Sequence, residues 1–233
     1  MNRTKIEWTD YTWNPVTGCL HGCEYCYARK ITQRFKSRYP VGFAPYFHEG
    51  RLNEPRGLKA PAKIFVVSMG DLFGAWVPAK WQDAVFDVID DCPQHTFQLL
   101  TKDPKTMKAA LHRRYRWEVP DNVWYGTSVT CAGDETRCLS LPVIDGGKAF
   151  ISFEPLLGPI DPKYSARGLI AAADWIIIGA QTNPTRLPDP AWVRDIIDAA
   201  RDVGAKVFMK DSLAPIGLPM LREFPGDKEA GLL

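Results

Sequence analysis

The chain has 233 residues, of which 45% are hydrophobic and 24% charged. This is enough to bury one substantial core, so we expect a single domain over residues 1–233. The formal net charge is only +2, from 29 basic and 27 acidic residues, which excludes the strong overall positive charge of many nucleic-acid binders and leaves only a local basic patch to hold such a partner. Because no long apolar run and no secretory leader is present, we expect a soluble, cytoplasmic protein.

Short apolar runs that alternate with amphipathic stretches predict an α/β fold. Each run is nearly continuous in apolar character, which is typical of strands buried on both faces of a parallel sheet. The predicted strands are Tyr11 to Thr17, Ile64 to Ser68, Phe97 to Leu100, Val123 to Val129, Ala149 to Phe153, Trp175 to Ala180 and Lys206 to Lys210. Apolar side chains at helical spacing predict helices over Pro78 to Cys92, Pro104 to Tyr115 and Asp189 to Val203. Repeated βαβ units of this kind form a barrel or a doubly wound sheet. We expect the end, from about Phe224 to Leu233, to be a loose tail.

Three of the six cysteines lie close together after the first predicted strand. Cys19, Cys23 and Cys26 have the spacing C-x3-C-x2-C, on a loop over residues 18–27 that leads into a helix. In a cytoplasmic protein this packing favours a metal site over disulfides. Three thiolates on a four-iron cluster leave one iron open for another ligand, which is a catalytic arrangement. The alternative is a structural zinc site completed by His21 or His48.

The motif C-x3-C-x-aromatic-C, with Tyr25 as the aromatic residue, resembles the signature of the radical S-adenosylmethionine (SAM) superfamily. More of the chain, roughly residues 7 to 210, resembles a family of small phage- and prophage-borne radical-SAM-like proteins, and more distantly the spore photoproduct lyases. The segments that carry this resemblance are TWNPVTGCLHGCEYCYA, VVSMGDLF, CPQHTFQLLTKDP, NVWYGTSV, FISFEPLLGPID and WIIIGAQ. For a phage-encoded protein the cytoplasm would be that of the host.

The resemblance implies a partial (βα)6 TIM-like barrel and an enzyme. It also implies a [4Fe-4S] cluster held by the three cysteines, whose open iron binds SAM. Reductive cleavage of SAM to a 5′-deoxyadenosyl radical would begin the reaction, and an external electron donor such as a flavodoxin or ferredoxin, or dithionite in vitro, would supply the electron. The cofactors would perform the difficult chemistry, while the protein orients them and excludes water.

Further candidate residues follow the predicted strands, where barrel enzymes carry their catalytic groups. The resemblance implies Asp71 as the partner of the SAM amino group, although an Asp capping the next helix is the alternative. Lys102 suits the SAM carboxylate and Ser128 the ribose, or both are exposed strand-end residues. The candidate cofactor-binding residues are Tyr25, Ser68, Gly70, Asp71, Lys102, Ser128 and Glu154; the candidate catalytic residues are Glu154 and Lys210; Gln181 and Asn183 are candidate substrate residues. A structural ion pair is the alternative for Glu154.

The remaining cysteines have less specific contexts. Cys131 and Cys138 are either ligands of an auxiliary cluster or free cysteines, and two thiolates alone cannot close a four-iron cluster. Cys92 falls on an apolar helix face and is predicted to lie in the core.

A basic and aromatic segment follows the cysteine motif. Between Tyr25 and His48 the chain carries five basic residues and no acid, namely Arg29, Lys30, Arg34, Lys36 and Arg38. Such a segment either grips nucleic acid, with Arg34 and Arg38 as substrate contacts, or is a solvated helix face. Arg113, Arg114 and Arg116 would extend a nucleic-acid surface.

Together with the resemblance, this segment suggests a DNA base or nucleotide as substrate, in phage DNA modification or photoproduct-lyase-like repair. A peptide or small metabolite is the alternative substrate. A non-catalytic, zinc-dependent nucleic-acid-binding protein is the alternative from another class.

Overall fold

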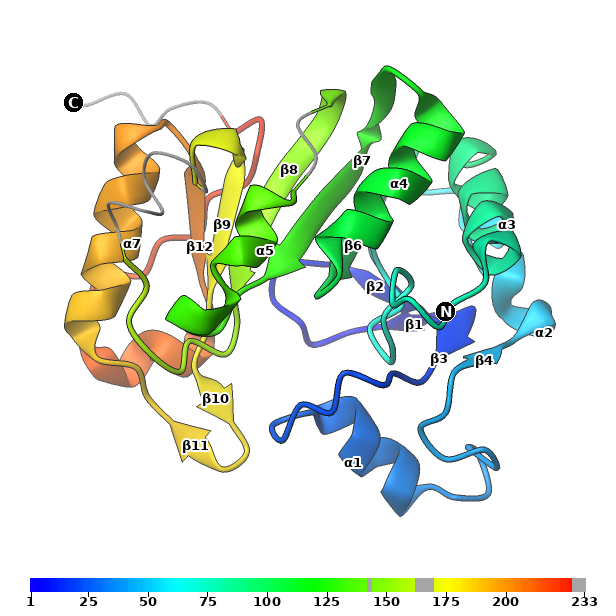
Figure 1. Cartoon of the computed structure of the whole chain (residues 1–233), viewed down its shortest axis with the longest axis horizontal. Coiled ribbons are helices and arrows are strands. Elements are labelled where there is room, and N and C mark those ends of the chain that lie inside the picture. The colour runs from blue at the N-terminus through cyan, green and yellow to red at the C-terminus, as the bar shows by residue number, and fades with distance from the viewer. Residues whose placement is uncertain (142–143, 162–169, 228–233) are drawn as a thin grey trace.

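The computed structural model describes residues 1–141, 144–161 and 170–227, and within them the main element is a curled sheet (Figure 1). Its strand order is β1-β2-β5-β6-β7-β8-β9-β12, and every neighbouring pair from β2 onward is parallel. The strands are β1 (Asn2–Arg3), β2 (Tyr11–Trp13), β5 (Lys63–Val66), β6 (Thr96–Thr101), β7 (Glu118–Ser128), β8 (Asp145–Phe153), β9 (Trp175–Ile178) and β12 (Lys206–Met209). The predicted α/β fold with a partial TIM-like barrel is confirmed.

Helices cover the outer face of this half-barrel and short elements gather at one end of it (Figure 1). The outer helices are α3 (Ala79–Asp90), α4 (Pro104–Tyr115), α5 (Thr136–Leu139) and α7 (Pro190–Asp202). At the carboxyl end of the strands lie α1 (Tyr27–Arg34) and the hairpin of β10 (Gln181–Thr182) and β11 (Thr185–Arg186). The remaining elements are β3 (Val16–Thr17), β4 (Tyr46–Phe47), α2 (Glu49–Leu52) and the 3₁₀ turns Glu54–Gly57, Ala132–Asp134, Ile170–Ala172 and Asp211–Ile216.

The three predicted helices form at the predicted places, but the first predicted strand is divided. Tyr11–Trp13 joins the main sheet beside β5, whereas Val16–Thr17 leaves it and pairs with Tyr46–Phe47. Pro15 lies between the two parts and has no N–H to donate to a strand ladder, so the chain bends away there. This bend directs the following cysteine segment across the end of the sheet.

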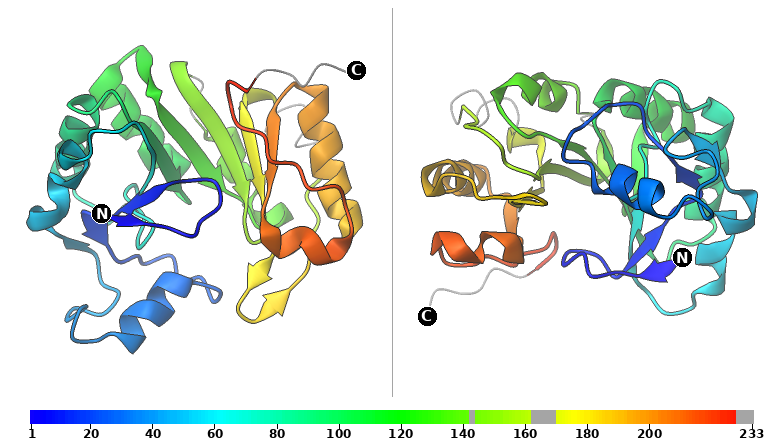
Figure 2. Two further views of the ribbon diagram at one scale, coloured as in Figure 1. Left: turned by 180° about the vertical axis from the view of Figure 1, so that it is seen from behind. Right: turned by 90° about the horizontal axis from the view of Figure 1, so that it is seen from below.

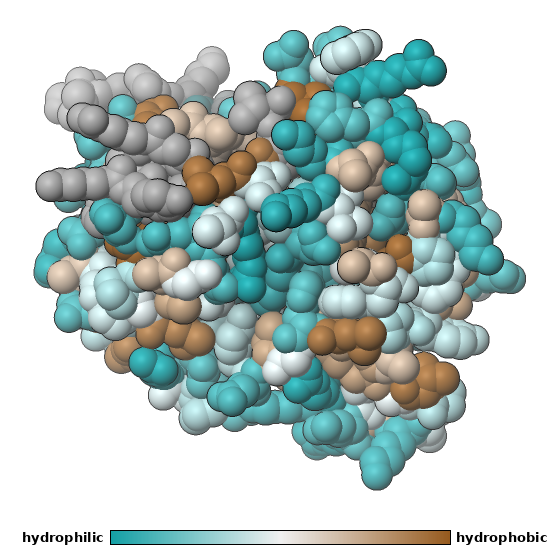
Figure 3. Space-filling model, in the orientation of Figure 1, coloured by the Kyte–Doolittle hydropathy of each residue, from teal (hydrophilic) through white to brown (hydrophobic). Residues whose placement is uncertain are grey.

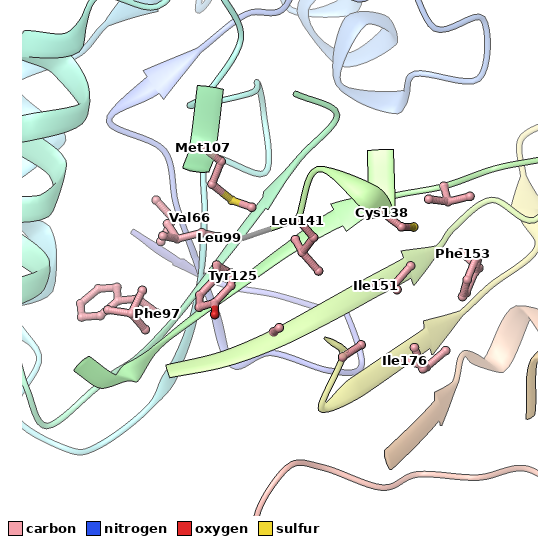
Figure 4. Close-up of a cluster of buried hydrophobic side chains, with 14 of the residues drawn as sticks. Val66, Phe97, Leu99, Met107, Tyr125, Cys138, Leu141, Ile151, Phe153 and Ile176 are labelled. Atoms are coloured by element: carbon pink, nitrogen blue, oxygen red, sulfur yellow. The ribbon is translucent and has the colours of Figure 1, made fainter. Parts of the chain in front are cut away.

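Two apolar clusters hold the sheet from its two sides. The larger lies between the strands and the outer helices and includes Phe97, Leu99, Met107 and Cys138 (Figure 4). The smaller fills the concave side and is mostly aromatic, comprising Trp8, Phe65, Trp124, Phe150, Trp175, Ile177 and Phe208. Because side chains alternate along a strand, β5, β7, β8, β9 and β12 each contribute to both clusters.

The N-terminal hairpin bridges the open side of the half-barrel (Figure 2). Trp8, in its tip, is 2% exposed and packs on Phe65 and on Trp175, with ring centroids 4.7 and 6.2 Å away. From the C-terminal segment, Phe224 packs at 5.4 Å on the same Trp175. The predicted loose tail is therefore wrong for its first residues, which are held by aromatic packing; residues 228–233 lie outside the described residues. None of the described helices is long and apolar enough to cross a membrane.

Candidate functional site

The cysteine loop lies at the carboxyl end of β5, held by backbone contacts. Gly18 N–H donates to the Met69 carbonyl at 2.9 Å, and Cys19 N–H donates to the Phe43 carbonyl at 3.1 Å. Gly18 has a φ of +90°, and a Cβ there would lie 2.1 Å from the Ala44 carbonyl oxygen, so glycine permits a close backbone approach. The loop is thus built against two segments distant in sequence.

The three thiols of this loop are half-buried and influence one another. Burial raises the pKa of Cys19 to about 12, and the charges of Asp71, Cys23 and Cys26 add to this effect, while the His21 backbone N–H opposes it. Cys26 is the N-cap of α1, and its Sγ accepts from Arg29 N–H at 3.4 Å. Among the described residues, no group of three or more His, Cys, Asp or Glu side chains is arranged to hold a metal ion.

The two histidines of the zinc alternative have hydrogen-bond partners other than the cysteines. His21 Nε2 lies 2.8 Å from Asp71 Oδ2, and His48 Nε2 lies 2.9 Å from Thr17 Oγ1. The Nε2 atom of each histidine therefore already has a protein partner.

Asp71 is buried and fully hydrogen-bonded, which differs from its predicted role. Its side chain accepts from His21 Nε2, Thr101 Oγ1 and the backbone N–H groups of Phe73 and Lys102, at 2.7 to 3.0 Å. Each carboxylate oxygen thus has two protein donors. The predicted contact of Asp71 with a SAM amino group is not supported, because such a group would have to displace one of them.

The turn that precedes Asp71 has an unusual backbone. Val67 has a φ of +60° and is 3% exposed, a conformation that costs a β-branched residue about 1–3 kcal/mol. Its N–H donates to the Trp13 carbonyl at 2.7 Å. In the same turn, the Ser68 carbonyl accepts from the Tyr27 hydroxyl at 2.6 Å, and a Cβ on Gly70 would lie 2.7 Å from the Gly18 carbonyl oxygen. The turn therefore contacts both ends of the cysteine loop.

Lys102 and Tyr25, both predicted cofactor-binding residues, lie together. The Lys102 ammonium is 5.6 Å from the centre of the Tyr25 ring. Burial, followed by the neighbouring Cys23, raises the pKa of Tyr25 above its usual value. Ser128 ends β7 and is 6% exposed, with its carbonyl accepting from Arg137 Nη1 at 3.1 Å. The predicted residues Tyr25, Ser68, Gly70, Asp71 and Lys102 are thus gathered around the cysteine loop.

Glu154 and Lys210 form an ion pair on the far side of the same end of the sheet. Lys210 Nζ contacts Glu154 Oε1 and also lies 3.5 Å from Glu7 Oε2. Burial lowers the pKa of the Lys210 ammonium, but the two carboxylates outweigh burial and raise it overall. Gly179 leaves room for the pair, since a Cβ there would lie 3.1 Å from Lys210 Cδ and 3.2 Å from Glu154 Cγ. The ion-pair alternative for Glu154 is therefore observed.

Glu7 is a member of this cluster that the sequence analysis missed. It comes from the N-terminal hairpin, and its Oε1 also accepts from Asp211 N–H at 2.9 Å. No motif marks it, because a single acid in a polar N-terminal segment has no distinguishing pattern; only its neighbour Trp8, an unusual residue for an exposed loop, hints that the segment is packed.

The hairpin that carries Gln181 and Asn183 reaches α1. Gln181 Nε2 donates to the Pro184 carbonyl at 2.9 Å, so its amide is engaged within the hairpin. The Asn183 carbonyl accepts from Lys30 Nζ at 3.0 Å. The hairpin that carries these two predicted substrate residues thus lies beside α1, the helix that follows the cysteine loop.

The basic segment on and after α1 is exposed except for the half-buried Arg29, and it forms no ion pair with the described residues. No carboxylate in the described part of the chain forms an ion pair with its members, Arg29, Lys30, Arg34, Lys36 and Arg38. Exposed large apolar side chains lie in the same stretch, namely Tyr27, Phe35, Val41 and Tyr46, and Leu20 is exposed on the cysteine loop before it. Figure 3 shows hydrophobic residues among hydrophilic ones over this part of the surface.

The predicted extension of the basic surface by Arg113, Arg114 and Arg116 is wrong for the first two, whereas for Arg116 it stays a prediction. Arg113 pairs with Asp83 at 2.9 Å, and Arg114 pairs with Asp87 at 2.8 Å and with Asp90. These acids lie on α3, so the arginines join two outer helices and their charge is neutralised there.

The other cysteines are free thiols. Cys138 is 4% exposed within the outer core, and burial raises its pKa to about 12, while Cys131 is half-buried. Because the described residues hold no arranged group of metal ligands either around this pair or around the cysteine loop, the auxiliary-cluster hypothesis stays a prediction. Cys92 is 1% exposed, which confirms its predicted place in the core.

Comparison with known proteins agrees with this fold. Two solved structures of spore photoproduct lyase, one complexed with dinucleoside spore photoproduct and one a cysteine mutant with the same ligand, match at TM-scores of 0.55 and 0.52. In both cases the identity is 12%, and the match covers 90% of this chain and 79% of the other. No curated protein sequence matches. The model of one family, described as a protein of unknown function, DUF5131, matches residues 3–214, so the chain belongs to the DUF5131 family.

Proposed function

We propose that this protein is a radical SAM enzyme whose cluster is held by Cys19, Cys23 and Cys26. The observation that carries the proposal is the place of the cysteine loop, which crosses the carboxyl end of a curled parallel sheet, beside the strand-end residues. In barrels of this kind the catalytic groups come from that end. The fold similarity to spore photoproduct lyase supports the proposal at the level of architecture.

The donor set of the loop fits an iron–sulfur cluster. Three thiols on one loop, close enough to affect one another's charge, are the ligands that such clusters use, and three of them leave one iron open. When bound, the cluster and SAM would supply a radical able to abstract hydrogen from a substrate. Lys102 is the residue that we assign to an anionic group of SAM, with Tyr25 beside it and Ser128 at the end of the neighbouring strand β7.

The chain's own groups would position the substrate. Lys210 forms ion pairs with both Glu154 and Glu7. This cluster lies across the strand ends from the cysteine loop. Glu154, through its oxygen not engaged by Lys210, is available as a hydrogen-bond acceptor, with Gln181 and Asn183 on the neighbouring hairpin. The bulky aromatic cluster beneath excludes water from the rest of the concave side.

We further propose a DNA base or nucleotide as the substrate. The unpaired basic residues on α1 suit phosphates and the exposed aromatic rings suit bases. The two similar structures are of spore photoproduct lyase with dinucleoside spore photoproduct, and a ligand of that class is consistent with this surface.

The first experiment tests the cluster. Protein purified without oxygen is reconstituted with iron and sulfide, reduced with dithionite in the presence of SAM, and assayed for iron, visible absorption and 5′-deoxyadenosine. We expect wild type and Cys131→Ser to be brown and to form 5′-deoxyadenosine, and Cys23→Ala to do neither. Cys131 is the matched control, because it is also half-buried but lies outside the motif. Colourless wild-type protein that binds zinc and leaves SAM intact would support the zinc-dependent binding protein instead.

The second experiment tests the substrate surface. Affinity for a single-stranded oligonucleotide is measured over a range of salt concentrations for wild type, Arg34→Ala, Arg38→Ala and Arg201→Ala. Each lost phosphate contact is expected to reduce the slope of log affinity against log salt by about 0.7. Arg201, an exposed arginine on α7, serves as the control and should leave the slope unchanged. Equal slopes for all four proteins would contradict a strand bound along α1.

A further inference from the structure

The buried carboxylate of Asp71 collects hydrogen bonds from three separate segments. Asp71 is 4% exposed. One oxygen accepts from Phe73 N–H in its own turn at 3.0 Å and from Thr101 Oγ1, the last residue of β6, at 2.7 Å. The other accepts from Lys102 N–H at 3.0 Å and from His21 Nε2 at 2.8 Å. The side chain therefore joins the ends of two neighbouring strands to the cysteine loop.

His21 is the loop's side of this connection. It stands between Cys19 and Cys23 in the sequence, and an ionised carboxylate can only accept, so Nε2 carries the hydrogen that it donates to Asp71. The Trp76 ring system and the imidazole pack in a T-shaped contact, with centroids 4.8 Å apart. Two contacts thus fix the ring and, through it, the backbone between the first two cysteines.

The same Asp71 oxygen also fixes Lys102. The backbone N–H of Lys102 donates to Asp71 Oδ2, the same atom that accepts from His21 Nε2. The Lys102 ammonium lies over the ring of Tyr25 on the cysteine loop. One buried oxygen is therefore shared by the loop that carries the cysteines and by the lysine assigned to SAM. A movement of either would be transmitted to the other through that oxygen.

We infer that Asp71 and His21 are positioning residues, and that their hydrogen bond holds the cysteine loop in register with Lys102 before any cofactor binds. This inference rests on the proposed function for the group that the loop would hold. The hydrogen bond between His21 and Asp71 does not depend on that proposal. Outer hydrogen bonds of this kind orient metal ligands, and losing one typically costs about 10- to 100-fold in metal affinity or activity.

The test compares His21→Ala, His21→Gln and His48→Ala with wild type. Glutamine is the conservative variant, because its amide N–H can also donate to Asp71. His48 is the control, a half-buried histidine whose ring bonds to Thr17 and not to Asp71. Asp71→Asn would disturb four buried hydrogen bonds at once and so test stability more than position, which is why the His21 variants carry the experiment.

The first measurement needs no cofactor. Hydrogen–deuterium exchange of the peptide covering residues 18–27 in metal-free protein is expected to be about tenfold faster in His21→Ala, since a hydrogen bond to a charged group is lost. His21→Gln should restore most of the protection, and His48→Ala should match wild type. Unchanged exchange in His21→Ala would overturn the inference whether or not the protein binds a cluster.

The second measurement uses the reconstituted protein. Iron release to a chelator is expected to be about 10- to 100-fold faster in His21→Ala than in wild type, with partial rescue by His21→Gln. If wild type holds no iron, the proposed function fails while the exchange result still decides the loop contact. If exchange rises but iron release and SAM affinity are unchanged, the contact exists but does not position the cofactors, and the inference is wrong.

Discussion

A methyl group added at Gly18 would test the close packing that places the cysteine loop. Gly18 directly precedes Cys19, and Gly22 directly precedes Cys23. Both have a positive φ, +90° and +76° respectively. A Cβ on Gly18 would lie 2.1 Å from the Ala44 carbonyl oxygen and 2.7 Å from Pro45 N, whereas a Cβ on Gly22 would have no heavy atom within 4 Å. Gly22→Ala is therefore a matched control that shares the backbone strain but not the clash.

The two terms can be estimated separately. An alanine in the left-handed region costs roughly 1–2 kcal/mol, and this applies to both variants. Overpacking adds about 1–3 kcal/mol, and at Gly18 the obstructing atoms are backbone, which cannot rotate aside as a side chain can. We expect Gly22→Ala to lower the free energy of unfolding by about 1–2 kcal/mol and Gly18→Ala by about 2–5 kcal/mol.

Urea unfolding of metal-free protein, followed by tryptophan fluorescence and circular dichroism, measures both values under one condition. A difference of at least about 1 kcal/mol between the variants supports the close approach of the loop to residues 43–45. Equal losses, or a larger loss for Gly22→Ala, would refute it. Reconstitution then shows whether the strained loop still takes up iron: the Gly18 variant should take up less than the Gly22 variant, because its loop must move.

Two further predictions concern the polar cluster and the aromatic cluster of the half-barrel. The pKa of Lys210 is above its ordinary value of 10.5, so its ion pairs stabilise the fold fully below that pH and are lost as the pH rises through the folded-state pKa. Lys210→Met should lower the free energy of unfolding by about 2 kcal/mol at pH 8. The difference in unfolding free energy from wild type should shrink above pH 10.5. If that difference stayed constant up to about one pH unit higher, the ion pairs would be contradicted. Trp8→Ala should cost about 3–5 kcal/mol in urea unfolding. Trp8→Phe should cost under about 1.5 kcal/mol, because the buried indole N–H has no hydrogen-bond partner among the described residues, and a large loss would show that this N–H matters.

Local patterns in the sequence were sufficient for the elements themselves. The helix predicted over Pro104 to Tyr115 has those bounds in the structure, with Asp103 as its N-cap, because capping and the 3.6-residue period act within one segment. The predicted strands were found for the same reason, since continuous apolar runs record burial on both faces. Pro15 was the exception, where a missing N–H divided one predicted strand into two.

The cysteine motif was also visible in the sequence, because its three cysteines lie within eight residues of one another. The role of Asp71 was not. Its partners His21 and Thr101 lie 50 and 30 residues away, and nothing local indicates that a strand-end acid will be occupied by protein donors instead of a cofactor.

The pairing of charges was decided by tertiary structure for the same reason. Arg113 and Arg114 are basic residues of the kind found in nucleic-acid-binding surfaces, but acids on the neighbouring helix α3 form ion pairs with them. Arg34 and Arg38 form no ion pair with the described residues. Lys210 meets Glu7 across the whole length of the chain. A sequence shows which segments bury one face and which residue types stand together, but hydrogen bonds and ion pairs depend on distances of a few ångströms between segments that only the packed sheet brings together.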